Sequence, residues 1–130
     1  MEAVPYTKRL TGRVVAVSPG VFRRVEVELP DGAHVESEVL FTGGGSFREQ
    51  GTITFNSGSD LHFRTLGTGS LVPSPTPGVR HGTVTWELDG GSGRFAEASG
   101  RITSSFTLTD DGDVTDSQDG LIFLRDDKEE

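Results

Sequence analysis

The feature that most constrains the fold is the segment from Gly90 to Gly100, which holds four glycines between two runs of strand-forming residues. Glycine adopts positive φ angles freely, and its lack of a side chain lets two backbones approach closely. Phe95 and the small residue Ala98 are of the kind that packs beneath a turn. The segment therefore predicts a tight, irregular connection between two strands.

The rest of the chain has the pattern of an all-β protein. No long segment has helical periodicity, and turn residues recur at intervals of about eight to twelve residues. Eight short strands joined mainly by hairpins predict an up-and-down antiparallel β-barrel, because closure removes the exposed strand edges. We expect one barrel domain over residues 1–124 and a charged, disordered tail at 125–130. The predicted strands are Thr11–Val17, Phe22–Leu29, His34–Phe41, Gly51–Asn56, Leu61–Leu66, Gly82–Leu88, Arg101–Thr109 and Val114–Leu124.

Two connections are longer than the others. The segment Thr42–Gln50 contains three consecutive glycines, which predicts a flexible flap. The segment Gly67–Gly78 contains three prolines, which predicts a stiffer, extended loop. Both segments either rim the mouth of the barrel or serve as ordinary connections. Within the last strand, Ser117–Gly120 is a candidate break.

Composition excludes several classes of partner and chemistry. The formal net charge is -8, and no basic stripe is present, which argues against nucleic acid and against an anionic membrane surface. The chain has no cysteine, so disulfides, thiolate nucleophiles and zinc–thiolate sites are excluded. No signal-peptide pattern is present, and no stretch approaches the roughly 20 apolar residues of a membrane helix. We therefore expect a cytoplasmic protein.

Alternation along the strands sorts the side chains onto a polar and an apolar face. The apolar face is rich in aromatic residues and has few polar ones, which is typical of a small-molecule pocket and equally of a filled core. A buried hydroxyl needs a partner, from the backbone or from a ligand, and an arginine needs an anion or a route to water. The candidate substrate-binding residues are Trp86, Phe41, Phe55, Phe63, Phe106, Ser37 and Ser104, with Arg23, which shares a face with Val21, Val25 and Val27.

No pattern of metal ligands stands out. The three histidines, at 34, 62 and 81, lack ligand spacing, and we expect no metal site from them. The aspartates at 110, 111, 113 and 116 lack the length and the terminal glutamate of a calcium loop, which indicates a solvated hairpin. We expect no cofactor.

The remaining acidic residues have a simple explanation on the outer surface. Glu36 and Glu38 point the same way, and cross-strand pairing with basic residues such as Arg24 accounts for them. The alternative is a barrel with a polar interior, which would bring Glu87, Arg64 and His62 together as an acid–base cluster.

The order Gly90-Gly91-Ser92-Gly93-x-Phe95-x-x-Ala98-x-Gly100, followed by a long strand and a Gly-Asp hairpin, resembles the C-terminal half of the allene oxide cyclase and dirigent-like barrels. The resemblance covers Gly82–Leu124. It implies a calycin-like eight-stranded barrel, an assembly of two or three copies, and an interior that shapes reactive hydrophobic molecules. It also implies structural roles for Gly90, Gly91, Gly93, Phe95 and Gly100.

This chain departs from both plant activities. Ser99 stands where dirigent proteins typically have an arginine, and Gly12-Arg13-Val14-Val15 replaces the glutamate motif on the first strand of allene oxide cyclases. The resemblance therefore implies the barrel fold and its interior, and it assigns no catalytic residue.

Two functions fit these observations. The first is a cofactor-independent cyclase or isomerase, in which an aromatic pocket holds a flexible hydrophobic substrate in its reactive shape. The second is a non-catalytic barrel, either a carrier of hydrophobic ligands or an interaction module whose interior is filled.

Overall fold

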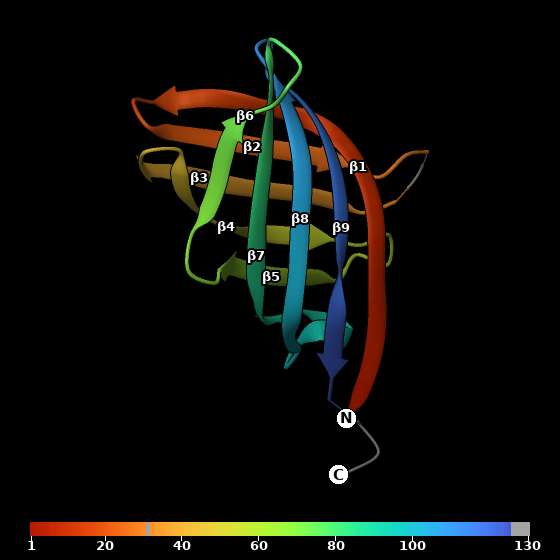
Figure 1. Cartoon of the computed structure of the whole chain (residues 1–130). Helices are drawn as coiled ribbons and strands as arrows, with labels where there is room; N and C mark the ends of the chain where they lie inside the picture. The colour runs from red at the N-terminus through yellow and green to blue at the C-terminus, as the bar shows by residue number, and fades with distance from the viewer. Residues whose placement is uncertain (31, 126–130) are drawn as a thin grey trace.

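The computed structural model describes residues 1–30 and 32–125, which form antiparallel strands and one 3₁₀ turn, η1 (Figure 1). Of the charged tail expected at 125–130, residues 126–130 lie outside the described residues. The elements are β1 (Glu2–Ser18), β2 (Val21–Val27), β3 (His34–Gly43), β4 (Ser46–Thr54), β5 (Asp60–Thr65), β6 (Gly69–Pro73), β7 (Val79–Gly91), η1 (Gly93–Phe95), β8 (Ser99–Thr109) and β9 (Asp113–Leu124).

The strands close into a barrel. The order β3-β2-β1-β9-β8-β7-β5-β4 returns to its start because β3 also pairs with β4. The short strand β6 is an addition to this ring of eight and pairs with both β4 and β7. The predicted all-β, eight-stranded antiparallel barrel is thus confirmed.

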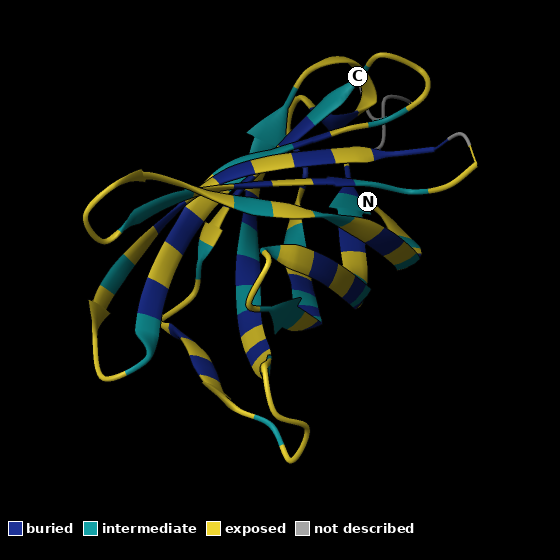
Figure 2. Ribbon diagram, turned by 90° about the horizontal axis from the view of Figure 1, so that it is seen from above, coloured by how far each residue is buried: buried dark blue, intermediate teal, exposed yellow. Residues whose placement is uncertain are grey.

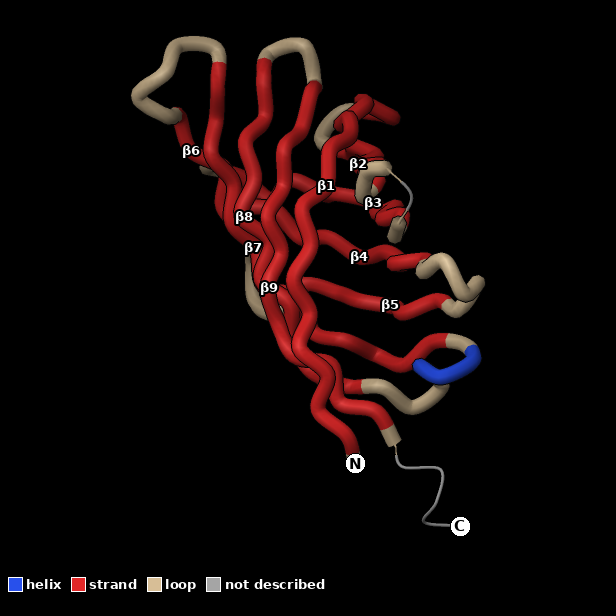
Figure 3. Tube along the Cα trace, turned by 90° about the vertical axis from the view of Figure 1, so that its right-hand side faces the viewer, coloured by secondary structure: helices blue, strands red, loops and turns tan. Residues whose placement is uncertain are grey.

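The two halves of the barrel cross each other. In Figure 1 the strands β2 to β5 run roughly horizontally, whereas β7, β8 and β9 run roughly vertically. The long strand β1 curves between the halves, because it pairs with β9 along most of its length and with β2 from Thr11 onward. In Figure 1 the β1–β2 and β3–β4 turns lie at the left, and the β6–β7 and β8–β9 turns lie at the top. We call the part of the barrel that these four turns surround the hairpin end. The other end, which we call the closed end, holds η1 and both described termini (Figure 3).

The glycine-rich connection between β7 and β8 covers the closed end. Gly90, Gly93 and Gly100 have φ values of 72°, 57° and 121°, a region that side chains rarely adopt. Between them η1 turns Phe95 inward, where it is 4% exposed and lies 4.7 Å from the ring of Phe55. The backbone of Gly91 crosses so close to Asp60 that a Cβ would overlap its carbonyl oxygen.

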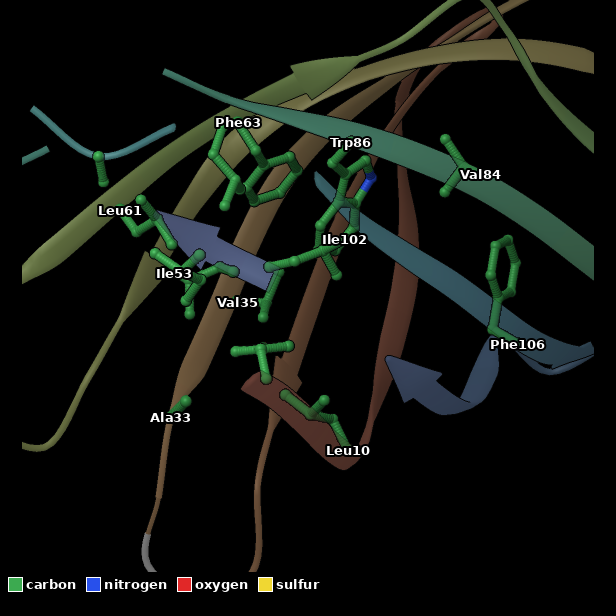
Figure 4. Close-up of a cluster of buried hydrophobic side chains, with 14 of the residues drawn as sticks. Leu10, Ala33, Val35, Ile53, Leu61, Phe63, Val84, Trp86, Ile102 and Phe106 are labelled. Carbon is green, nitrogen blue, oxygen red and sulfur yellow. The ribbon is translucent and has the colours of Figure 1, made fainter. Parts of the chain in front are cut away.

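Most of the predicted inward face is buried. Burial alternates along the strands in Figure 2, and Figure 4 shows Trp86 and Phe63 together among aliphatic side chains. Strand β2 is the exception, and the interior placement of Arg23 was wrong. Arg23 and Val25 are exposed, whereas Arg24 and Glu26 are buried. The valines of β2 favoured the opposite assignment, with Arg23 inside. The interior at this level is polar, and it therefore takes Arg24 and Glu26 in place of the valines.

Several strands differ from their predicted bounds. Strand β1 begins at Glu2, where it already pairs with Leu124. The predicted flap shortens to Gly44 and Gly45, because β3 extends to Gly43 and β4 begins at Ser46. The proline-containing loop includes β6, whose Pro73 stands at the strand end, where a missing N–H is tolerated. The candidate break at Ser117–Gly120 does not occur, since these polar residues pair on both sides with β1 and β8.

Replacing Phe95 by alanine tests whether the closed end is part of the core. We expect the free energy of unfolding to fall by about 3 kcal/mol, because the substitution leaves a cavity beside Phe55. Denaturation in urea measures this loss. The same truncation at the half-buried Phe123 is the matched control and should cost less than half as much. Equal losses would show that Phe95 contributes no special packing.

Candidate functional site

A cavity of about 210 Å³ opens at the hairpin end of the barrel. Aromatic rings form much of its wall, and they come from β2, β3, β4 and β8. Neighbouring rings contact in sequence, with centroid separations of 5.4 Å for Phe22–Phe41, 5.8 Å for Phe41–Phe47 and 6.2 Å for Phe47–Phe106. The other lining residues are Val14, Arg24, Val39, Leu71, Arg80, Leu108, Thr109, Asp110 and Gly112.

Two of these rings rest on glycines of the neighbouring strand. Phe106 on β8 pairs with Gly82 on β7, and a Cβ at Gly82 would overlap the phenylalanine ring. Phe47 on β4 pairs with Gly69 on β6 in the same manner. An aromatic side chain that covers a cross-strand glycine is a known device for packing a sheet. Here it places both rings against the wall and so leaves the cavity open.

Arg24 forms the inner floor of this cavity and is the centre of a buried ion cluster. Its Nη2 donates to Ser104 Oγ and to Asp116 Oδ2, both at 2.7 Å. Its Nη1 faces both oxygens of Glu49 at 3.2 and 3.3 Å, and its Nε donates to Glu26. The guanidinium carbon lies 4.3 Å from the ring centroid of Phe106, which makes a cation–π contact.

Neutral side chains complete the hydrogen bonding of the carboxylates. The hydroxyl of Ser37 and the indole N–H of Trp86 both donate to Glu49, the latter at 3.0 Å. The amide of Gln118 donates to Asp116 at 2.6 Å and accepts a 2.7 Å bond from the hydroxyl of Tyr6. The network therefore runs across the barrel interior.

The cluster holds one cation and three carboxyl groups, all 3% exposed or less. Burial raises the pKa of Glu26 to about 8, with Asp116 adding to the rise and Arg24 opposing it. Glu26 Oε1 also has no hydrogen-bond partner among the described residues. Both observations fit a protonated Glu26 at neutral pH, which reduces the excess of negative charge.

The neighbouring groups are shifted as well. Burial alone would lower the pKa of Arg24, but the carboxylates of Glu49, Glu26 and Asp116 raise it above its ordinary value. Burial, and then the charge of Asp116, raises the pKa of Tyr6, so its phenol stays protonated.

The predicted binding residues fall into five separate places. Phe41 and Phe106 line the cavity, and Ser37 and Ser104 belong to the ion cluster, where their partners are side chains and not backbone groups. Phe63 stacks on Trp86 at 3.8 Å in the core. Phe55 lies at the closed end beside Tyr6, and Arg23 lies on the outer surface.

Sequence reasoning missed most of the site, although alternation held a signal for it. Extending the inward row of β4 from Phe47 by two residues gives Glu49, and extending that of β9 from Val114 gives Asp116. Both residues are charged, so a search for inward faces by apolar residues does not select them. The missed residues are Phe22, Arg24, Glu26, Phe47, Glu49, Asp116 and Gln118.

The alternative acid–base cluster does not form in the interior. Arg64 and Glu87 make an ion pair of 3.3 Å on the outer face, where His62 is also exposed. Glu36 and Glu38 are exposed as predicted, but their expected partner Arg24 is inside. Residues 1–30 and 32–125 hold no group of three or more His, Cys, Asp or Glu side chains placed to bind a metal ion. Within the same residues, no helix is long and apolar enough to span a membrane.

Comparison with protein-family models, curated proteins and solved structures found no match for this chain. The fold and the site together define the class as an eight-stranded antiparallel β-barrel with an aromatic cavity above a buried ion cluster. The resemblance to allene oxide cyclase and dirigent-like barrels stays a prediction.

The neighbours Arg23 and Arg24 provide a matched test of the cluster. Replacing Arg24 by methionine should lower the free energy of unfolding by about 3–5 kcal/mol, because buried carboxylates lose their cation. Arg23→Met should change it by no more than about 0.5 kcal/mol, since the side chain is exposed. Urea denaturation at pH 7 measures both. Similar effects of the two substitutions would contradict the assignment.

Glu26 should make stability depend on pH. Its pKa rises from near 4.5 to about 8 on folding, so its stabilising contribution is complete below pH 4.5 and is lost as the pH rises through 8. One titrating group changes the free energy of unfolding by at most about 1.4 kcal/mol per pH unit. The glutamine in Glu26→Gln does not titrate. The fall in the free energy of unfolding between pH 5 and 8 should therefore be absent in this variant.

Urea denaturation across this pH range measures the slope for each protein. Glu38→Gln, which replaces an exposed glutamate on β3, should keep the wild-type slope. An unchanged slope in Glu26→Gln would mean that Glu26 titrates alike in the folded and unfolded chain.

Proposed function

We propose that this protein is a cofactor-independent cyclase or isomerase that binds a small hydrophobic molecule in the cavity at the hairpin end. The observation that carries the proposal is the cavity itself, with its four contacting aromatic rings. An apolar cavity of about 150 Å³ is enough to hold benzene. The volume of about 210 Å³ therefore suits a single ring with short substituents, or one end of a longer chain.

The proposed catalysis is conformational. Arg24 is the charged group at the cavity floor, and its Nε, Nη1 and Nη2 all have partners within the ion cluster. It therefore acts on a substrate mainly through its fixed charge and not as a proton donor. Aromatic walls that hold a flexible chain in a folded shape lower the entropic part of a cyclisation barrier.

A non-catalytic carrier is the second candidate. It is favoured because all three nitrogens of the Arg24 guanidinium already have partners in the ion cluster. The cavity floor is therefore left without a free acid or base. The two candidates share the binding step and differ in whether the bound molecule changes. Incubation with a linear polyene followed by chromatography separates them, because cyclisation yields an isomer of equal mass, whereas a carrier returns the polyene unchanged.

Gly82→Ala tests the binding step. The added Cβ displaces the ring of Phe106 from its seat and fills the cavity, so we expect the affinity for single-ring hydrophobic ligands to fall by about tenfold or more. Calorimetric titration with a panel of polyenes and monocyclic compounds measures this. Phe106→Ala should act in the opposite sense and favour larger ligands.

Leu88→Ala is the matched control for a loss of stability. Leu88 is buried on the same strand as Gly82 but lies outside the cavity. It should lower stability and leave the affinity unchanged. If Gly82→Ala binds like the wild type, the ligand does not occupy this cavity.

A further inference from the structure

The rim of the cavity carries an arginine that has no ion pair among the described residues, in contrast to Arg24 at the floor. Arg80 lies in the inward row of β7 with Gly82, Val84 and Trp86, one step closer to the hairpin end. Within residues 1–30 and 32–125 its guanidinium has no ion pair or hydrogen bond, and the residue is exposed. An arginine at the edge of an apolar pocket, with its donors free, is suited to a carboxylate.

The deep end of the cavity disfavours an anion. Arg24 is already surrounded by Glu26, Glu49 and Asp116, and this cluster has more acids than bases. A ligand carboxylate placed there would meet like charge in a buried environment. An anionic ligand would therefore enter with its apolar part inward and keep its charged end at the rim.

Asp110 is the other charged residue at the rim, and it opposes an anion. Its carboxylate lies beside Gly78 in the β6–β7 turn. A Cβ atom added at Gly78 would be 3.3 Å from Asp110 Oδ2. No ion pair joins it to Arg80 among the described residues. Removing its charge should thus strengthen anion binding, which gives a test of opposite sign to that of Arg80.

We propose that the ligand of this cavity is a small apolar monoanion, with its hydrophobic part among the phenylalanine rings and its carboxylate at Arg80. This inference rests on the proposed binding function and specifies the chemical class of its ligand. The cavity volume limits the apolar part to about one ring.

Three probes with the same apolar part and different end groups test the proposal: 4-phenylbutyrate, 4-phenylbutan-1-ol and 4-phenylbutylamine. Calorimetric titration at low salt should show that the acid binds more tightly than the alcohol by about three- to tenfold. Arg80→Gln should abolish that preference and leave the affinity for the alcohol within twofold. Arg80→Lys should retain most of it, and Asp110→Asn should increase it.

Arg9→Gln is the matched control, because Arg9 is an exposed arginine on β1 outside the cavity. It should behave like the wild type, and thermal melting should confirm that all variants are folded. If the three probes bind equally, or the amine binds best, the anion preference is wrong and the hydrophobic cavity still stands. If none binds, the proposed function and this inference fail together.

Discussion

The buried guanidinium of Arg24 is the interaction on which the rest of the barrel depends. It links β2 to β4, β8 and β9, through Glu49, Ser104 and Asp116. A buried ion pair adds little net stability, since desolvation offsets much of the attraction. Its value here lies in specificity. A slip of one residue in β4 or β9 would turn Glu49 or Asp116 to the outside and remove a carboxylate from Arg24.

The cluster also divides the interior into two parts. On one side Trp86 stacks on Phe63 while its indole N–H reaches Glu49, so the dense core is bonded directly to the cluster. On the other side Arg24 meets the ring of Phe106, which is a wall of the cavity. The aromatic rings near the hairpin end thus surround open space, whereas those near the closed end fill it.

The fold could be predicted from the sequence because its signals are local. The glycines from Gly90 to Gly100 mark a tight connection, and apolar alternation identifies the inward faces of β3, β5, β7 and β8. The site could not be predicted in the same way, because its inward residues are charged. In β2 the valines at 21, 25 and 27 indicated one face, whereas Arg24 and Glu26 occupy the other. Only partners from strands distant in sequence make that burial favourable, and they become neighbours once the barrel closes.

The cavity owes its shape to small residues as much as to large ones. Phe106 and Phe47 lie flat because Gly82 and Gly69 leave room for them on adjacent strands. A single methyl group at either glycine would move a ring, so the cavity volume is controlled by two positions that do not line the cavity. The ion cluster below is bonded to four strands and cannot shift in the same way. Under the proposed function, the walls of the cavity select the molecule that fits, and the rim charges at Arg80 and Asp110 select which of its ends stays outside.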